Sequence, residues 1–176
     1  MARALALTLA AGTLLLAGSC AAPQKLLPPP VPVPRPSPRP VPPPPPADWR
    51  DALQTAGNWR WGMIAGRSVA SFGQPGAAPL VTLTCERDRA RVLIARQGLA
   101  TGAVPMMLRS GTSLRPLSSD PQLGASGMVT AELPARDLAL DAIAFSRGRF
   151  ALETAGLATL YLPSWPEISR VVEDCR

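Results

Sequence analysis

Apolar and polar residues alternate along several short stretches of this chain. In the clearest of them, Val81, Leu83 and Cys85 would lie on one face of an extended backbone, with threonines between them. Alternation of this kind, bounded by glycine, proline or charged turn residues, predicts strands that are buried on one face. The pattern predicts short strands at residues 59–65, 68–72, 80–85, 91–97, 104–110, 112–118, 128–133, 149–154 and 159–162.

A helical spacing follows the seventh of these strands. Asp137 can accept a hydrogen bond from a backbone N–H and so begin a helix that runs to Phe145. Leu138, Ala142 and Phe145 recur at helical intervals, which predicts an apolar face for this helix. Gly148 fits a position of positive φ beyond the helix end. We therefore expect one short internal helix.

The C-terminus carries a second helical signal. Ser164 and Glu167 have the spacing of a capping box, in which each side chain accepts a hydrogen bond from the other residue's backbone N–H. Pro166 is tolerated in the first turn because its missing donor would have no partner there. Four apolar residues then follow at intervals that place them on one stripe of a helix: Ile168, Val171, Val172 and Cys175.

Two of the three cysteines belong to these elements. Cys85 faces inward on a strand, and Cys175 faces inward on the C-terminal helix, while Cys20 lies near the N-terminus. In an oxidising compartment, two cysteines in one folded domain are expected to pair. We expect an α+β fold with a mostly antiparallel sheet of short strands and one short internal helix. Its C-terminal helix would be tied to the sheet by a Cys85–Cys175 disulfide.

The N-terminal quarter of the chain differs in composition from the rest. Residues 1–22 combine Arg3, a long apolar run and small residues, which is the layout of a secretory signal peptide. More than half of residues 23–46 are proline, which fixes φ and removes a hydrogen-bond donor. We expect this segment to be a disordered stalk of polyproline II character and residues 47–176 to form a single folded domain.

The end of the signal-like segment, Leu16-Ala17-Gly18-Ser19-Cys20, resembles the lipobox of bacterial prolipoproteins. The resemblance implies that Cys20 is lipidated and becomes the first residue of the mature protein, although the family prefers leucine where this chain has Ala17. Ordinary cleavage after Ala21 is the alternative. With lipidation, the resemblance implies a lipid anchor on the periplasmic side of the outer membrane, because Ala21 rather than an aspartate follows the cysteine.

The charge and the residue types of the chain exclude several classes of function. The formal net charge is +6, but the expected domain carries fourteen arginines and twelve acidic residues, so we expect no nucleic-acid partner. The chain has no histidine, and its lysine, Lys25, lies in the stalk. This excludes histidine-dependent nucleophiles and a serine–lysine dyad in the domain. We expect no cofactor, no metal site and no enzyme, and a hydrolase with a carboxylate pair is the catalytic alternative.

Two groups of side chains are candidates for a binding surface. Trp59 and Trp61 would share one strand face, where they could stack against sugar rings or a partner's prolines, or pack in the core. Arg87, Arg89 and Arg91 recur at intervals of two, and they could bind an anion on a strand or form the solvated tip of a hairpin. The sequence leaves these alternatives open.

The C-terminal part of the chain, in residues 145–150, 165–167 and 173–176, resembles exported bacterial proteins of an uncharacterised family. The resemblance implies an envelope location and no known activity. We expect a non-catalytic envelope lipoprotein module on a proline-rich stalk, with an envelope protein or peptidoglycan as partner. The alternative is a small inhibitor or sensor of another envelope protein. Cys85 in a hairpin resembles lysozyme-inhibitor lipoproteins, but the expected C-terminal helix does not fit their all-β barrels.

Overall fold

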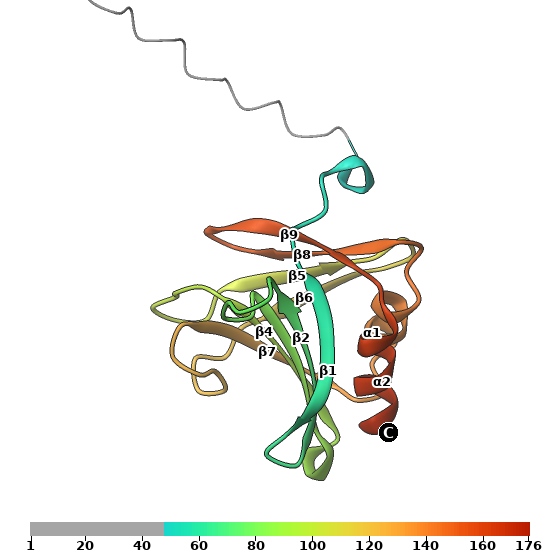
Figure 1. Ribbon diagram of the computed structural model, residues 1–176. Coiled ribbons are helices and arrows are strands. Elements are labelled where there is room, and N and C mark those ends of the chain that lie inside the picture. The colour runs from blue at the N-terminus through green and yellow to red at the C-terminus, as the bar shows by residue number, and fades with distance from the viewer. Residues whose placement is uncertain (1–47) are drawn as a thin grey trace, which may run out of the picture. The chain divides into compact units, whose positions relative to one another are not determined.

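The computed structural model describes residues 48–176, in which seven short strands precede a first α-helix, and two more strands and a second α-helix follow it (Figure 1). The leader, the stalk and the lipidation site expected at Cys20 lie outside the described residues. The strands are β1 (Asn58–Ile64), β2 (Arg67–Gly73), β3 (Val81–Glu86), β4 (Arg91–Gln97), β5 (Pro105–Arg109), β6 (Leu114–Ser118), β7 (Met128–Pro134), β8 (Arg149–Thr154) and β9 (Leu157–Pro163). The α-helices are α1 (Leu138–Ala144) and α2 (Pro166–Asp174), and two 3-10 turns are η1 (Trp49–Asp51) and η2 (Arg87–Arg89).

The strands form two sheets, and all the pairs within them are antiparallel. One sheet has the order β1-β2-β3-β4-β7, and the other has the order β6-β5-β8-β9. In Figure 1 the four-stranded sheet lies over one end of the five-stranded sheet. Each strand expected from the alternation of apolar residues is present, with ends that differ from the expected ones by at most two residues. The expected α+β fold of mostly antiparallel strands is therefore confirmed.

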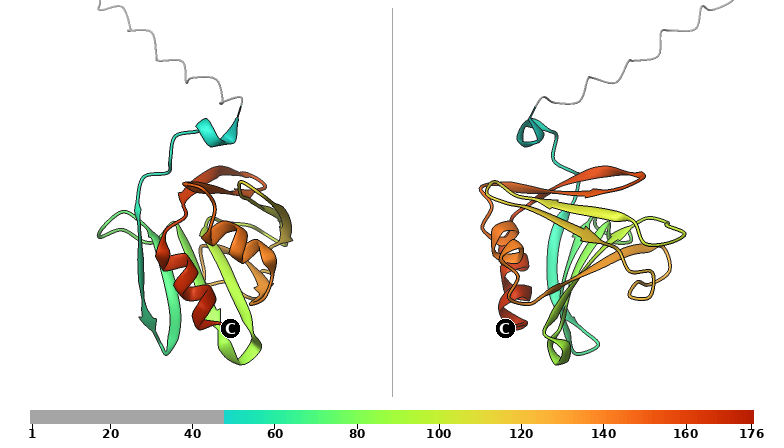
Figure 2. Two further views of the ribbon diagram at one scale, coloured as in Figure 1. Left: turned by 90° about the vertical axis from the view of Figure 1, so that its right-hand side faces the viewer. Right: turned by 180° about the vertical axis from the view of Figure 1, so that it is seen from behind.

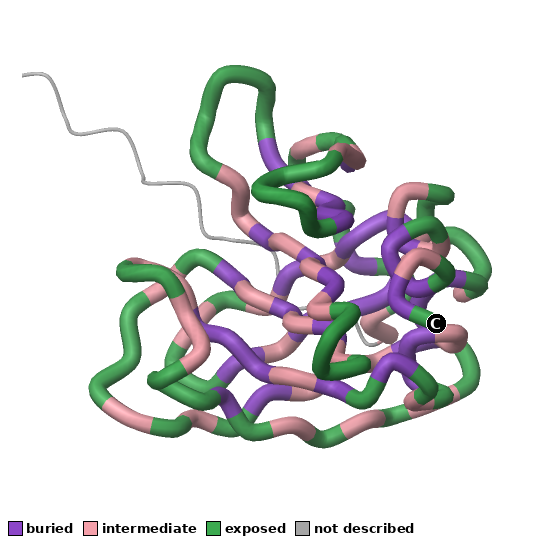
Figure 3. The backbone as a smooth tube through the Cα atoms, turned by 90° about the horizontal axis from the view of Figure 1, so that it is seen from below, coloured by how far each residue is buried: buried purple, intermediate pink, exposed green. Residues whose placement is uncertain are grey.

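Burial follows the alternation that predicted the strands. In β3, Val81, Leu83 and Cys85 are buried, and the threonines between them are half-buried. Figure 3 shows the same change between buried and less buried positions along other strands. The inward side chains of both sheets join those of the two helices in one core. The β1–β2 hairpin turns at Ala65 and Gly66, which both have positive φ, as a two-residue turn that matches the twist of its strands requires.

Helix α1 begins where the sequence predicted, but its buried face differs from the prediction. The Asp137 side chain accepts a hydrogen bond from the Ala139 N–H at 2.9 Å and caps the helix. Leu140 and Ile143 are fully buried on the inner face, with two alanines beside them. Leu138, expected on the inner face, is exposed, and so is Phe145 just after the helix. The helix has apolar residues on both sides, so periodicity alone could not select the inner one.

Helix α2 begins two residues after Ser164, and the predicted capping box does not form. The N-cap residue is Trp165, and the side-chain oxygens Ser164 Oγ and Glu167 Oε2 are buried without a hydrogen-bond partner in the described part of the chain. The Ser164 N–H donates to the Gly148 carbonyl at 3.3 Å, which holds this residue beside the start of β8. This bond takes up the backbone donor that the capping box would offer to the Glu167 side chain.

The C-terminal helix is tied to the five-stranded sheet as expected. Ile168, Val171 and Val172 are buried, and α2 packs against β1, β2, β3 and α1. Both α-helices lie on the same side of the domain (Figure 2). A disulfide joins Cys85 of β3 to Cys175, with a Cα–Cα distance of 5.4 Å. This covalent tie fixes the end of α2 beside the end of β3, where a pocket opens.

Candidate functional site

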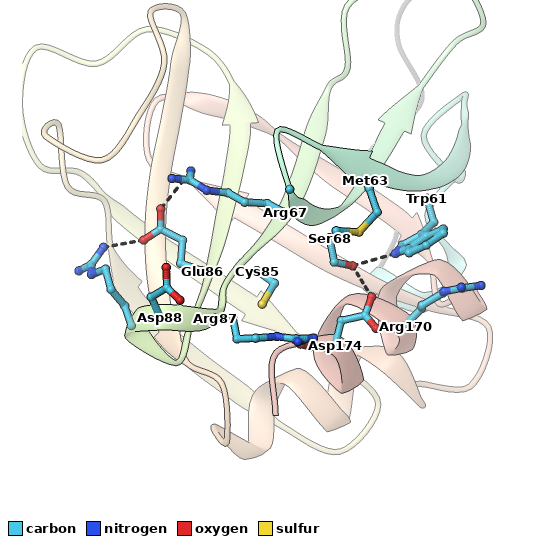
Figure 4. A pocket seen from close by; sticks show the side chains of 12 residues that line it. Trp61, Met63, Arg67, Ser68, Cys85, Glu86, Arg87, Asp88, Arg170 and Asp174 are labelled. Atoms are coloured by element: carbon cyan, nitrogen blue, oxygen red, sulfur yellow. Dashed lines mark hydrogen bonds and ion pairs between the residues drawn. The ribbon is translucent and has the colours of Figure 1, made fainter.

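A pocket of about 640 Å³ opens where the β1–β2 hairpin, the end of β3 with η2, and α2 meet (Figure 4). Each of these elements contributes side chains, and the disulfide lies at the pocket wall through Cys85. The lining therefore depends on the packing of α2 against the sheet. It includes Trp61, Met63, Arg67, Ser68, Glu86, Arg87, Asp88, Arg89, Arg170 and Asp174.

A chain of two hydrogen bonds crosses the pocket from β1 to α2. The Trp61 indole Nε1–H donates to Ser68 Oγ at 2.8 Å, and the Ser68 hydroxyl donates to Asp174 Oδ2 at 2.5 Å. Ser68 is buried, whereas Trp61 is half-buried. Asp174 directly precedes Cys175, so the disulfide also holds in place the Asp174 carboxylate, which accepts the second of these two hydrogen bonds. The network holds the indole in one orientation at the pocket wall.

One face of the indole ring is covered from within the protein. The guanidinium carbon of Arg170 lies 3.7 Å from the centre of the Trp61 ring, which is a cation–π contact. Arg170 and Asp174 are four residues apart on α2, so both project from the same side of the helix. Met63, two residues beyond Trp61 in β1, is 59% exposed and lines the same pocket.

Two of the pocket arginines form ion pairs around Glu86. Its carboxylate oxygens lie 3.3 Å from Arg67 Nη1 and 2.8 Å from Arg89 Nη1. Arg89 also lies 3.0 Å from Glu132, which neighbours this cluster from β7. Hydrogen bonding to Glu86 raises the pKa of the Arg89 guanidinium, so this group stays charged. These charges hold the tip of the β3–β4 hairpin in place.

The other two pocket arginines have no ion pair with a carboxylate within residues 48–176. Arg87 Nε donates to the backbone carbonyl of Asp174 at 2.9 Å, at the C-terminal end of α2 where the helix dipole favours a cation. Arg170 lies over the Trp61 ring. Arg87 and Arg170 therefore give the pocket cationic groups that no carboxylate of the described chain neutralises.

The structure brings together three of the five candidate binding residues. Trp61, Arg87 and Arg89 line the pocket, although nothing in the sequence linked the tryptophan to the arginines. Trp59 belongs to the core: its ring centre lies 5.2 Å from that of Phe72, and its Nε1–H donates to the Pro163 carbonyl. Of the two alternatives, core packing is confirmed for Trp59, so the two tryptophans do not form a shared stacking platform and only Trp61 of the pair is partly accessible.

The three arginines that recur at intervals of two do not lie together either. Arg87 and Arg89 belong to η2 at the tip of the β3–β4 hairpin, which confirms the hairpin-tip alternative. They are not on a strand, so the regular spacing does not place them on one strand face. Arg91 begins β4 and is not among the lining residues.

Sequence reasoning did not select the other side chains of the pocket as candidates. Met63, Ser68, Arg170 and Asp174 carry no motif, and their positions depend on how α2 packs against the β1–β2 hairpin. The one local signal was the spacing of Arg170 and Asp174, which places both on the polar side of the predicted helix.

Comparison with known proteins adds no family to these observations. The chain matches no protein-family model, and neither curated proteins nor solved structures show a significant match to it. Within residues 48–176, acidic residues and cysteines do not gather in groups of three that could hold a metal ion. The helices of this same region are all too short or too polar to cross a membrane.

Proposed function

We propose that this protein is a non-catalytic binding module of the bacterial cell envelope, exported by its leader, lipidated at Cys20 and displayed on its proline-rich stalk. The observation that carries the binding role is the convergence of Trp61, Arg87 and Arg170 in one open pocket. Aromatic and arginine side chains are the residue types that most often dominate binding energy at protein interfaces.

The pocket chemistry favours a peptide that bears a carboxylate. Arg87 and Arg170 offer N–H groups that no carboxylate of residues 48–176 engages as an ion pair, and guanidinium groups bind carboxylates through charge-assisted hydrogen bonds. Met63 and the indole of Trp61 offer an apolar contact beside these charges. Acidic segments of envelope proteins and the stem peptides of peptidoglycan share this chemistry.

The acidic groups of the pocket favour binding over catalysis. A hydrolase with two carboxylates requires one of them to donate a proton to the substrate. Glu86 instead pairs with Arg67 and Arg89, and Asp174 accepts the hydroxyl proton of Ser68 in a hydrogen bond. These two of the three lining carboxylates thus act as acceptors that hold the walls of the pocket together, and the third, Asp88, is exposed in η2.

One observation favours an inhibitor or sensor of another envelope protein as the second candidate function. Met63 and Ile64, at the tip of the β1–β2 hairpin, are each 59% exposed. Exposed apolar side chains beside a pocket that carries charged groups are typical of protein interaction sites. A macromolecular partner could cover this tip while its acidic group enters the pocket.

The binding role is tested with the chain from residue 21 to residue 176, which lacks the lipidation site. Binding is measured to purified peptidoglycan sacculi in one arm and to solubilised envelope proteins in the other. We expect binding in one arm, weakened by about ten-fold in Arg87→Gln and in Arg170→Gln, because a hydrogen bond between charged groups is lost. Arg136→Gln, an exposed arginine outside the pocket, is the matched control and should bind normally.

Absence of binding in both arms, or equal binding by all three variants, would contradict the binding role of the pocket. The proposed anchoring has its own test in mass spectrometry of the mature N-terminus. An acylated Cys20 is the expected result, and an unmodified terminus at Ala22 would show ordinary cleavage instead.

A further inference from the structure

A second surface of the domain exposes apolar side chains around α1. Trp49, Leu138 and Phe145 line a groove of about 960 Å³, which shares no lining residue with the pocket. Leu138 is 81% exposed and Phe145 is 72% exposed. Leu114, 55% exposed, adjoins Leu138 in a neighbouring hollow. We call Trp49, Leu114, Leu138 and Phe145 the apolar patch.

The fold of the domain does not account for this exposure. A surface helix normally turns its polar residues outward, but α1 has Leu138 and Ala142 on its outer side and only Asp141 as a charged residue. Its inner side already fills the core through Leu140 and Ile143. Clustered exposed apolar side chains of this size mark a contact surface.

The rim of the apolar patch is basic. Arg50, Arg147 and Arg149 line the groove together with Asp141. Asp141 is already ion-paired with the C-terminal arginine at 2.9 Å, and Asp48 nearby pairs with Arg50 at 3.2 Å. Arg147 is exposed, and neither it nor Arg149 pairs with a carboxylate in the described part of the chain. The surface therefore combines protruding apolar groups with uncompensated positive charge.

The charge of the rim argues against two candidates that could cover the apolar patch, namely residues 23–46 and a second copy of the protein. Residues 23–46 precede Trp49 in the sequence, but they carry Lys25, Arg35 and Arg39 and no acidic residue. They would bring like charge to the basic rim. A second copy related by a two-fold axis would set the same arginines against one another.

We infer that the apolar patch rests on the surface of an anionic phospholipid bilayer. Leu138 and Phe145 would insert at the boundary between headgroups and acyl chains, and Arg147 and Arg149 would contact phosphates. This inference does not use the ligand of the pocket, so either assignment can fail without the other.

Vesicle flotation tests the inference with residues 21–176, which carry no lipid and contain both sheets, the core and the disulfide. We expect the protein to float with vesicles of phosphatidylglycerol and phosphatidylethanolamine but not with phosphatidylcholine alone, and to dissociate as salt rises. Leu138→Ser combined with Phe145→Ser should weaken binding by roughly ten-fold or more, since the inserted apolar area is lost. Arg147→Gln should weaken binding and reduce its dependence on salt.

The matched control is Leu99→Ser, because Leu99 is 84% exposed but lies outside the groove. It should bind as the unmodified protein does, and thermal unfolding should show that all variants remain folded. Failure of the unmodified protein to float, or equal flotation of the double variant, would overturn the inference. A dimer, or a contact with residues 23–46, that the same double substitution abolishes would also overturn it by assigning the apolar patch to another occupant.

Discussion

Gly57 and Gly76 both lie at positive φ, at 148° and 77°, but they differ in what surrounds them. A Cβ at Gly57 would lie 3.0 Å from the backbone carbonyl carbon of Gly73 and from the buried Phe72 ring, whereas a Cβ at Gly76 would meet open space. Alanine can enter the left-handed region near the φ of Gly76 at a modest cost, whereas the φ of Gly57 lies well outside that region. Backbone conformation and packing therefore both disfavour a side chain at Gly57 more strongly than at Gly76.

We predict that Gly76→Ala lowers the free energy of unfolding by about 1 to 2 kcal/mol, through backbone strain alone. Gly57→Ala should cost about 1 to 3 kcal/mol more, because its φ is less accessible to alanine and the methyl group also displaces core atoms. Urea unfolding of the two variants measures this difference directly. Equal losses of stability would show that the chain before β1 moves freely enough to relieve the contact.

At the scale of elements, α2 links the stability of the domain to the geometry of the pocket. The helix has nine residues, which is too short to persist alone in water, so packing and the disulfide must hold it. Its residues Arg170 and Asp174 complete the pocket next to Trp61 and Ser68. Loss of its anchor should therefore disturb the pocket before it disturbs the sheets.

We predict that replacing Cys85 and Cys175 together by serine costs about 2 to 5 kcal/mol. Amide exchange should rise first in residues 168–174, because this C-terminal segment loses its covalent tie while the strands keep their hydrogen bonds. Exchange measured by mass spectrometry should show this order. A uniform rise across β3 and α2 would contradict the role assigned to the disulfide.

The strands and the helices differed in how well they could be predicted from the sequence. The strands were predictable because a buried face requires alternation within each strand, as Val81, Leu83 and Cys85 illustrate. The orientation of α1 was not, since the helix has apolar residues on both sides. The capping box at Ser164 does not form, and the Ser164 N–H that the motif assigns to Glu167 donates instead to Gly148, a partner that local spacing does not reveal.

The candidate site was only partly predictable for the same reason. Trp61, Arg87 and Arg89 stood out by residue type, but Ser68 and Asp174 are common residues that matter through one another. They are 106 positions apart in the chain and meet only because α2 packs on the β1–β2 hairpin. The sequence indicated the disulfide that fixes this packing but not the contacts around it.

At the scale of the whole molecule, the stalk and the folded domain have separate roles. Fourteen of the 24 residues in 23–46 are prolines, which supply no backbone N–H to a sheet, and the segment has only five leucine and valine side chains to contribute to a core. We predict that their deletion changes the thermal midpoint of the domain by less than about 2 °C, as calorimetry would measure. A decrease of about 10 °C would show that the segment packs on the domain and contributes to its stability.

The central claim is that the pocket formed by Trp61, Arg87 and Arg170 meets a partner in the envelope. Photo-crosslinking in intact cells tests it most directly, with a photoreactive amino acid placed at Met63 in the pocket or, as control, at exposed Leu99. We predict one discrete adduct from position 63, abolished by Arg170→Gln, and none from position 99. The absence of an adduct at position 63, or identical adducts from both positions, would contradict the claim.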